Sequence, residues 1–418
     1  MPYETRVAQT AHELATLYKD WELLRCQQAC PRIDQHPVWV TLRASRMDAG
    51  RVLAVTLYEC GRLVGVAPLI QSRWHLNWRV HLPGIKKRFA RFTLNTTDFC
   101  GESLIAPQDE QAHRTLLAAV YAACASCDVL RFESLSTESM LWRLLQTDRR
   151  ARGQRWLWQP LPPSPRRMIR LGTTFEEYLA QRFSKETSRK LRQEVRQLAK
   201  ACGKPLVFQS VTKRVEIPAY LTQVERLSAS TWQGKHLGSV VRNTETEREH
   251  LGALANQGWL LCYLLSAGDD PLAFLIGHHA DGIYYADRTG YDLRWARRGP
   301  GKVIWYKTLE DLHSRGNIRW LDFYHDDREY KQFFANTCYQ EAGLFLIRKT
   351  VRTGMAFAYP VSAAALYKTV SAVLACVGLL PAVRRLGRNL LEGHYKRHSA
   401  VTWMSRVLRR REKPDDDL

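Results

Sequence analysis

Four prolines fall between residues 160 and 165, in the segment QPLPPSPRR that spans residues 159–167. Proline has no amide hydrogen and a fixed backbone angle, so this segment cannot continue a helix or a central strand. It therefore predicts a linker between two domains, 1–158 and 168–350, followed by a basic helical tail, 351–418. The length of 418 residues agrees with this division, because single domains cluster around about 100–150 residues.

Both halves alternate between helical and strand patterns. In the first half, β-rich runs at 51–58 and 62–70 flank Gly61 and predict a hairpin, and an alanine-rich helix at 110–127 precedes a strand at 129–135. The predicted elements of the second half are, in order, a helix at 174–200, a strand at 206–212, helices at 218–232 and 244–257, a hairpin at 259–267 and 271–278, a strand at 283–289, a helix at 302–314 and strands at 319–323 and 342–349. We therefore predict an α/β fold with mixed sheets in two tandem domains.

The chain is strongly basic, with a formal net charge of +21. This charge predicts an anionic partner: a phosphate-bearing donor, RNA, or the inner face of a membrane.

The first residues are partly acidic and contain no apolar run, so we expect neither a secretion signal nor an anchor, and we expect a cytoplasmic location. The cysteines follow no disulfide framework, and the pair Cys124 and Cys127 has no second pair to complete a zinc site, so no metal is expected.

A basic, glycine-containing loop connects the predicted strand at 283–289 to the helix that follows it. The loop contributes Arg297, Arg298, Gly299, Gly301 and Lys302 as candidate phosphate ligands. The first amides of a helix have no partner inside it, the helix dipole is positive there, and glycine lets a phosphate approach the backbone. The alternative is a surface turn with solvated basic residues.

The sequence resembles the FemAB-like branch of the GNAT superfamily, and within it the CelD-like acyltransferases that are associated with cellulose and exopolysaccharide biosynthesis. The residues that carry the resemblance are Trp39, Val66-Ala67-Pro68-Leu69, Thr97-Asp98-Phe99, the helix at 183–203, Gly290-Tyr291-Asp292 and Leu321-Asp322-Phe323. The resemblance implies tandem GNAT-like domains that move an acyl group to an amine or hydroxyl of a sugar, a polysaccharide precursor or a small molecule.

The resemblance also implies the donor, which is acyl-coenzyme A in GNAT enzymes and aminoacyl-tRNA in FemAB transferases. GNAT enzymes bind the pyrophosphate of the coenzyme with a loop written Arg/Gln-x-x-Gly-x-Gly/Ala. The present sequence keeps Gly299 and Gly301 but has Ala296 at the position of the leading basic residue. A catalytically idle scaffold in a polysaccharide-synthesis assembly is therefore a further alternative.

Acyl transfer from a thioester requires a proton acceptor for the nucleophile and a proton donor for the leaving thiolate. Asp322 and His325 follow a predicted strand, where α/β proteins present side chains to ligands, and carboxylates beside His325 suit a general base. His278 ends the strand AFLIGHH, and alternation leaves open whether His278 or His279 faces the ligand. A structural or solvated role remains an alternative for each of these residues.

Several other residues are candidates for substrate contacts. Tyr330 is a candidate proton donor and Lys331 a candidate anion contact. The candidate aromatic contacts for a sugar or acyl group are Trp232, Tyr285 and Tyr291, although aromatic residues at such positions are more often core.

Two basic segments bear on the choice of partner. The helix near 182–204 is rich in Arg and Lys and would suit tRNA phosphates, anionic lipid or the 3′-phosphate of coenzyme A, or form a solvated surface. The apolar run between Pro360 and Pro381 contains Lys368 and many small residues, so we expect a helix that lies on the protein or on a membrane surface rather than across a bilayer.

Overall fold

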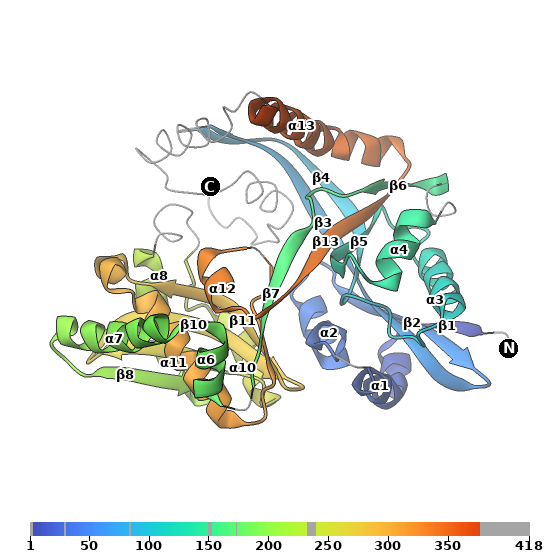
Figure 1. Ribbon diagram of the computed structural model, residues 1–418. Coiled ribbons are helices and arrows are strands. Elements are labelled where there is room, and N and C mark those ends of the chain that lie inside the picture. The colour runs from blue at the N-terminus through green and yellow to red at the C-terminus, as the bar shows by residue number, and fades with distance from the viewer. Residues whose placement is uncertain are drawn as a thin grey trace. The chain divides into compact units, whose positions relative to one another are not determined.

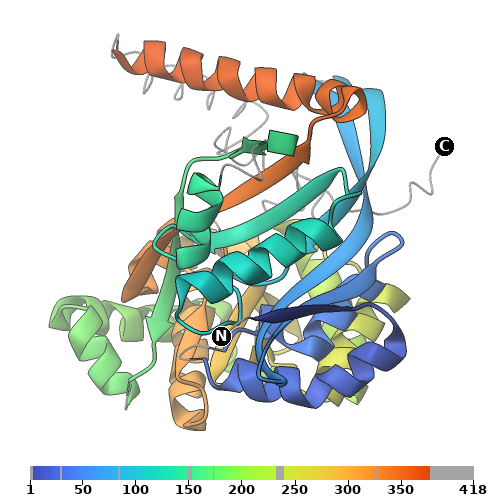
Figure 2. The same ribbon diagram turned by 90° about the vertical axis from the view of Figure 1, so that its right-hand side faces the viewer.

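The computed structural model describes residues 3–28, 31–82, 85–148, 153–172, 174–231, 240–325 and 327–376. The chain forms two compact units: unit 1 combines Met1–Pro163 with the segment that starts at Gln340, and unit 2 is Ser164–Tyr339. Figures 1 and 2 show the mixed α/β architecture of both units.

These boundaries differ from the predicted ones at two places. Ser164–Arg170 is a strand, β7, so the linker is shorter than 159–167. The last strand, β13 (Thr337–Arg348), pairs with unit 1 although we predicted it in the second domain. The alternation of apolar and polar residues indicates that a strand exists, but it does not show which sheet the strand joins.

The sheet of unit 1 has the strand order β1-β2-β3-β4-β5-β13, and β6 pairs with β13. Its strands are β1 (Glu4–Ala8), β2 (Arg51–Glu59), β3 (Arg62–Leu82), β4 (Ile85–Phe99), β5 (Val129–Ser136), β6 (Arg155–Trp158) and β13. Only β4 and β5 run parallel, and a helix connects them.

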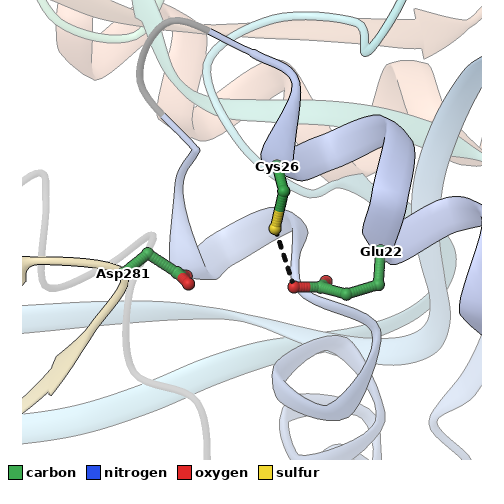
Figure 3. A group of neighbouring side chains, drawn as sticks. All are labelled: Glu22, Cys26 and Asp281. Atoms are coloured by element: carbon green, nitrogen blue, oxygen red, sulfur yellow. Dashed lines mark hydrogen bonds between the residues drawn. The ribbon is translucent and has the colours of Figure 1, made fainter.

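The helices of unit 1 are α1 (Ala11–Cys26), α2 (Pro37–Ser45), α3 (Glu110–Ala123), α4 (Met140–Thr147) and α13 (Val351–Cys376). Capping defines their starts: Thr10 and Glu13 form a capping box at α1, and Asp109 accepts two amides at α3. Near the end of α1, the Cys26 thiol donates to Glu22 Oε1 at 3.3 Å (Figure 3). Glu22 also accepts a hydrogen bond from Arg25 Nε. The carboxylate of Glu22 is therefore already satisfied within α1.

The sheet of unit 2 has the order β8-β9-β10-β11-β12-β7. Its strands are β7, β8 (Leu206–Val211), β9 (Cys262–Ala267), β10 (Asp270–Ala280), β11 (Ile283–Tyr291) and β12 (Trp320–Asp322). Again one pair, β11 and β12, is parallel and is connected by a helix. The units therefore share a strand order, which confirms the predicted α/β fold with tandem domains.

The helices of unit 2 are α6 (Phe175–Arg182), α7 (Lys185–Cys202), α8 (Ile217–Ser230), α10 (Glu245–Asn256), α11 (Pro300–Arg315) and α12 (Glu329–Phe334). We predicted one helix at 174–200, and this was wrong. Phe183 is extended, and the Ser184 hydroxyl accepts the Thr187 amide at 3.2 Å, so a new helix starts there.

Candidate functional site

The parallel strands β11 and β12 part at a defined point. They pair only at 283–285 with 320–322, after which β12 ends while β11 continues to Tyr291. Opposite β10, the register of β11 jumps from Arg288 to Ala286, so Asp287 is an extra residue in a β-bulge. A bulge bends its strand, and ligands of α/β sheets bind at the carboxyl ends of parallel strands. This point, near Tyr285 and Asp322, is therefore the candidate site.

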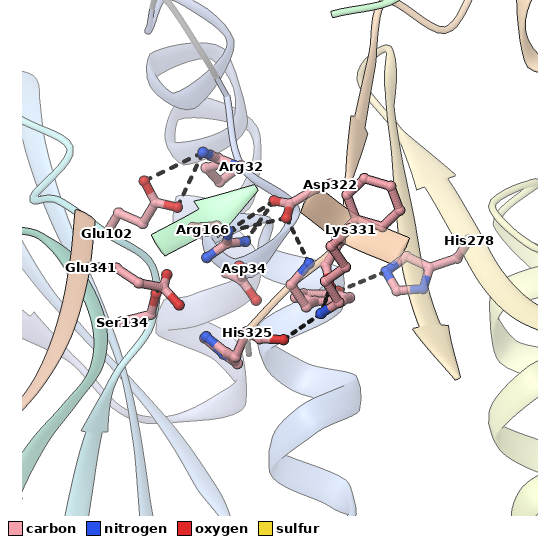
Figure 4. A network of polar contacts seen from close by, with 12 residues as sticks. Arg32, Asp34, Glu102, Ser134, Arg166, His278, Asp322, His325, Lys331 and Glu341 are labelled. Atoms are coloured by element: carbon pink, nitrogen blue, oxygen red, sulfur yellow. Dashed lines mark hydrogen bonds and ion pairs between the residues drawn. The ribbon is translucent and has the colours of Figure 1, made fainter. Parts of the chain in front are cut away.

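The loop after β12 holds Tyr324 in an unusual conformation. Its φ is +54°, in the left-handed region that bulky residues rarely adopt. Asp322 Oδ1 accepts the Tyr324 amide at 2.8 Å, and the buried Lys331 Nζ donates to the carbonyls of Phe323 at 2.7 Å and His325 at 2.5 Å (Figure 4). These three hydrogen bonds stabilise a strained loop of the kind that is concentrated at functional sites.

Asp322 forms a buried ion pair with Arg166 of β7. Arg166 Nε lies 3.1 Å from both carboxylate oxygens and Nη2 lies 2.6 Å from Oδ2, with both side chains at most 2% exposed. Two desolvated charges are tolerated at such a place because the bidentate geometry satisfies them. The Arg166 guanidinium also lies 5.7 Å from the ring centroid of Tyr324. Asp322 therefore positions the loop and is not a free base.

His278 of β10 contacts the same tyrosine. Its Nε2 lies 3.3 Å from Tyr324 Oη, and its ring stacks on Tyr285 with 5.2 Å between centroids. Burial lowers the pKa of His278 from 6.5 to about 3. The imidazole is therefore neutral near pH 7, where it is a hydrogen-bond partner for Tyr324 and a poor base.

The buried His278 predicts an acid-sensitive fold. Its folded pKa lies below the unfolded value, so the unfolded chain takes up a proton as pH falls below 6.5 whereas the folded chain does so only near pH 3. Between pH 7 and pH 5 this group should lower the free energy of unfolding by about 2 kcal/mol. Urea unfolding at both pH values should show a smaller loss for His278→Gln than for wild type. The exposed His12→Gln should behave like wild type, and an unchanged pH dependence in His278→Gln would contradict this account.

The other candidate residues have different surroundings. His325 is half-buried directly after Tyr324, and its ring centroid lies 6.2 Å from that of Tyr324. Tyr330 stacks on Trp305 with 5.4 Å between centroids. Lys331, predicted as an anion contact, instead donates to backbone carbonyls. Trp232 lies outside the described residues.

The predicted phosphate loop forms the start of α11. Arg297 and Arg298 end a 3-10 helix (Leu293–Arg298) and are exposed. Gly299 has a φ of +67°, and a Cβ on Gly301 would lie 2.9 Å from the ring of Tyr291. Backbone geometry and the packing of Tyr291 thus require both glycines, with or without a ligand.

An acidic residue of α7 lies beside this loop. Lys302 Nζ is 3.3 Å from Glu194 Oε1, while Glu194 Oε2 is buried and, among the described residues, has no hydrogen-bond partner. That oxygen would lie 3.5 Å from a Cβ on Gly299. The charge of Lys302 is therefore already compensated, and the cations left for a phosphate here are Arg297 and Arg298.

The face of α7 that points away from the core is basic. Its core face consists of Ser188, Leu191 and Leu198. The exposed basic residues of the segment are Lys185, Arg189, Lys190, Arg192, Arg196, Lys200 and Lys204. Helix α7 packs against both the 3-10 helix 293–298 and α11, so it lies beside the loop that carries Arg297 and Arg298.

Sequence reasoning missed three important residues. Arg166 lay in the predicted linker, Tyr324 lay between the candidates Asp322 and His325 without being named, and Glu194 lay in a helix that was described only as basic. A buried carboxylate at the end of a strand requires a cation, so Asp322 was the signal that one of the nearby arginines would pair with it.

The sequence of unit 2 matches a known family. Residues 185–332 match the family model described as the acetyltransferase (GNAT) domain. The match runs from the start of α7 into α12 and includes the parting strands β11 and β12. This match supports an acyltransferase. A comparison with curated proteins found no match.

One solved structure shares the fold over most of the chain, and two others are less similar to it. The structure of FemX has a TM-score of 0.55 at 10% identity, covering 82% of this chain and 97% of that chain. A tandem GNAT protein from the clavulanic acid biosynthesis pathway has a TM-score of 0.47 at 13% identity, covering 82% and 98%. A conserved protein of unknown function from Bacteroides thetaiotaomicron has a TM-score of 0.49 at 10% identity, covering 82% and 100%. At these identities the likeness concerns the fold alone.

Proposed function

We propose that unit 2 transfers an acyl group from acyl-coenzyme A to an amine or hydroxyl of a sugar, a polysaccharide precursor or a small molecule. The observation that carries this proposal is the parting of β11 and β12 beside a tyrosine hydroxyl that is held in place by its surroundings. Tyr324 is fixed through Asp322, Lys331 and His278 at the carboxyl ends of the parallel strands. Helix α11 starts after β11, so its amino terminus lies at the same edge of the sheet.

The start of α11 would hold the phosphates of the donor. The Gly301 amide belongs to the first turn of the helix, where amides and dipole favour an anion, and Arg297 and Arg298 are exposed beside it. The thioester would then extend toward the end of β12. Tyr291, 38% exposed and packed on Gly301, would contact the donor on the way.

The chemistry needs two proton transfers. The acceptor nitrogen or oxygen attacks the thioester carbonyl, and its proton passes to His325. When the C–S bond breaks, the sulfur leaves as a thiolate and takes the proton of the Tyr324 hydroxyl. Arg166 and Asp322 position Tyr324 without touching substrate, and the neutral His278 orients its hydroxyl.

Release of free thiol from acetyl-coenzyme A tests the function with any acceptor, because the thiol is a product of every transfer. Wild-type protein should release thiol faster when amino sugars, amino acids or polyamines are supplied one at a time. At least one acceptor class should raise the rate about tenfold or more over buffer, since positioning of the acceptor is a large part of catalysis. A panel of longer acyl-coenzyme A donors extends the test. Uniform background release with every donor and acceptor would count against the proposal.

The basic face of α7 favours a second donor, aminoacyl-tRNA, as in FemAB transferases. Lys185, Arg189, Arg196 and Lys200 are exposed, and no carboxylate among the described residues pairs with them. Phosphate-dominated RNA binding weakens steeply with salt. Filter binding of aminoacyl-tRNA that disappears between about 50 and 200 mM salt would support this donor. A protein that binds neither donor would fit a non-catalytic scaffold in a polysaccharide-synthesis assembly.

A further inference from the structure

Helix α13 packs on unit 1 with one face only. Thr353, Ala356 and Phe357 are buried, and the Ala356 carbonyl accepts from Trp78 Nε1 at 2.9 Å. The first turns of the helix contact β3, and Figure 2 shows α13 crossing the strands β3 and β4 near its start and extending away from them. The opposite face is open to solvent.

That open face is an uncharged stripe. Val351 is 80% exposed and Met355 54% exposed. The stripe continues through exposed residues at alternating spacings of three and four, namely Ala358, Ser362, Ala365 and Thr369. Such spacing places all of them on one side of a helix. Between Thr353 and Thr369 the only charged residue in the sequence is Lys368.

A two-stranded ribbon lies next to α13. Strand β2 pairs with β3 only as far as Gln71, and β4 pairs with β5 only from Thr96 onward, so residues 72–82 and 85–95 pair only with each other. An isolated ribbon of this kind is marginal in water, and α13 supports it through Trp78 and Tyr359, whose ring centroids are 5.6 Å apart. Among the described side chains of the ribbon, Arg73 and Arg91 are exposed basic residues.

The start of α13 combines an exposed aromatic residue with exposed cations. Trp156 of β6 is 43% exposed and lies next to Gly354, where a Cβ would be 3.5 Å from its ring. Arg348 and Lys349 are exposed just before the helix. Tryptophan beside basic residues is typical of a protein surface at the level of lipid headgroups.

No helix in the described part of the chain has the length and hydropathy to cross a bilayer. A helix that is half packed on a sheet and half apolar toward solvent can instead lie in the plane of the headgroups. The uncharged stripe of α13 cannot form ion pairs with RNA phosphates. Basic residues around an apolar centre, in contrast, match an anionic bilayer in both charge and polarity.

We propose that the open face of α13, together with Trp156, Arg348 and Lys349, binds the surface of an anionic lipid bilayer. The helix lies parallel to the membrane, Val351 and Met355 enter the headgroup region, and the cations contact acidic headgroups. This surface belongs entirely to unit 1 and is independent of the proposed reaction of unit 2.

Co-sedimentation of the full chain with vesicles tests the proposal. Vesicles of phosphatidylcholine with about 30% phosphatidylglycerol should bind at least about tenfold more protein than vesicles of phosphatidylcholine alone. The double variant Val351→Glu with Met355→Glu should bind the anionic vesicles at least about tenfold more weakly, because it places two carboxylates in the apolar stripe.

The matched control is Val207→Glu with Val215→Glu, which adds the same charge to valines of unit 2 that are 47% and 82% exposed. The control should bind vesicles like wild type, and thermal melts should show that both variants are folded. The proposal would be overturned if the α13 variant and the control variant lost the same amount of binding to anionic vesicles. It would also be overturned if wild type bound neutral and anionic vesicles equally. Wild-type self-association that disappears in Val351→Glu with Met355→Glu, without lipid binding, would assign the stripe to a second copy of the chain instead.

Discussion

Replacing Asp322 by alanine should lower the free energy of unfolding of unit 2 by about 3–5 kcal/mol, because it leaves a buried guanidinium without its carboxylate. Arg166 and Asp322 are 2% and 0% exposed, so water cannot replace the lost partner. The same substitution removes the acceptor of the Tyr324 amide. Urea unfolding followed by tryptophan fluorescence measures the loss.

The neighbouring ion pair provides a matched control. Arg167 and Asp327 form a similar contact with side chains 23% and 28% exposed, and Asp327→Ala should therefore cost less than about 1 kcal/mol. Joint replacement of Arg166 by Met and Asp322 by Leu should recover most of the stability, since no buried charge is left unpaired. A similar loss for Asp322→Ala and Asp327→Ala would contradict the assignment of Asp322 as the anchor of the loop.

Tyr324→Phe should lower turnover by about 10²–10⁴-fold while donor binding stays within a few-fold of wild type, since removal of a proton donor in the transition state has this effect. The ring and its contact with Arg166 are kept, and only the hydroxyl next to His278 is lost. Steady-state thiol release and calorimetry of donor binding separate the two effects. Tyr58→Phe, on β2 of unit 1, should leave both unchanged.

Two histidine variants refine the same prediction. His325→Gln should lose turnover by a comparable factor if His325 accepts the proton of the acceptor, whereas His278→Gln should have a smaller effect through the orientation of Tyr324. If Tyr324→Phe has normal turnover and His278→Gln has reduced turnover, the proton transfer would be assigned to His278 on β10 instead of Tyr324. Normal activity in all three variants would show that the group at the end of β12 is not catalytic.

Local sequence patterns predicted most elements of the fold. The hairpin at Gly61, the helix α11 and the strands before and after it followed from alternation, helical periodicity and glycine in turns. These local patterns could not predict which sheet contains β13, because that depends on backbone pairing between segments that are distant in the sequence. The break between α6 and α7 was missed because the residues on both sides follow a helical pattern. The break itself depends on the Ser184 side chain, which caps the start of α7.

Local sequence patterns also predicted only part of the candidate site. Position at or after the end of a predicted strand made Asp322, His325 and His278 candidates for a ligand site, and the structure places them around one loop. Their roles depend on burial and partners that sequence does not contain. Burial leaves His278 neutral, and Arg166 engages Asp322 from a segment that was predicted as a linker.

Calorimetric titration with coenzyme A tests the central claim most directly, because it requires no acceptor. Wild type should bind, and Arg297→Ala with Arg298→Ala should weaken binding at least about tenfold by removing the two exposed cations beside the start of α11. Glu194→Gln should tighten binding, because it removes a negative charge beside the proposed phosphate position. Absence of binding by wild type, or equal binding by all three proteins, would contradict the placement of the donor.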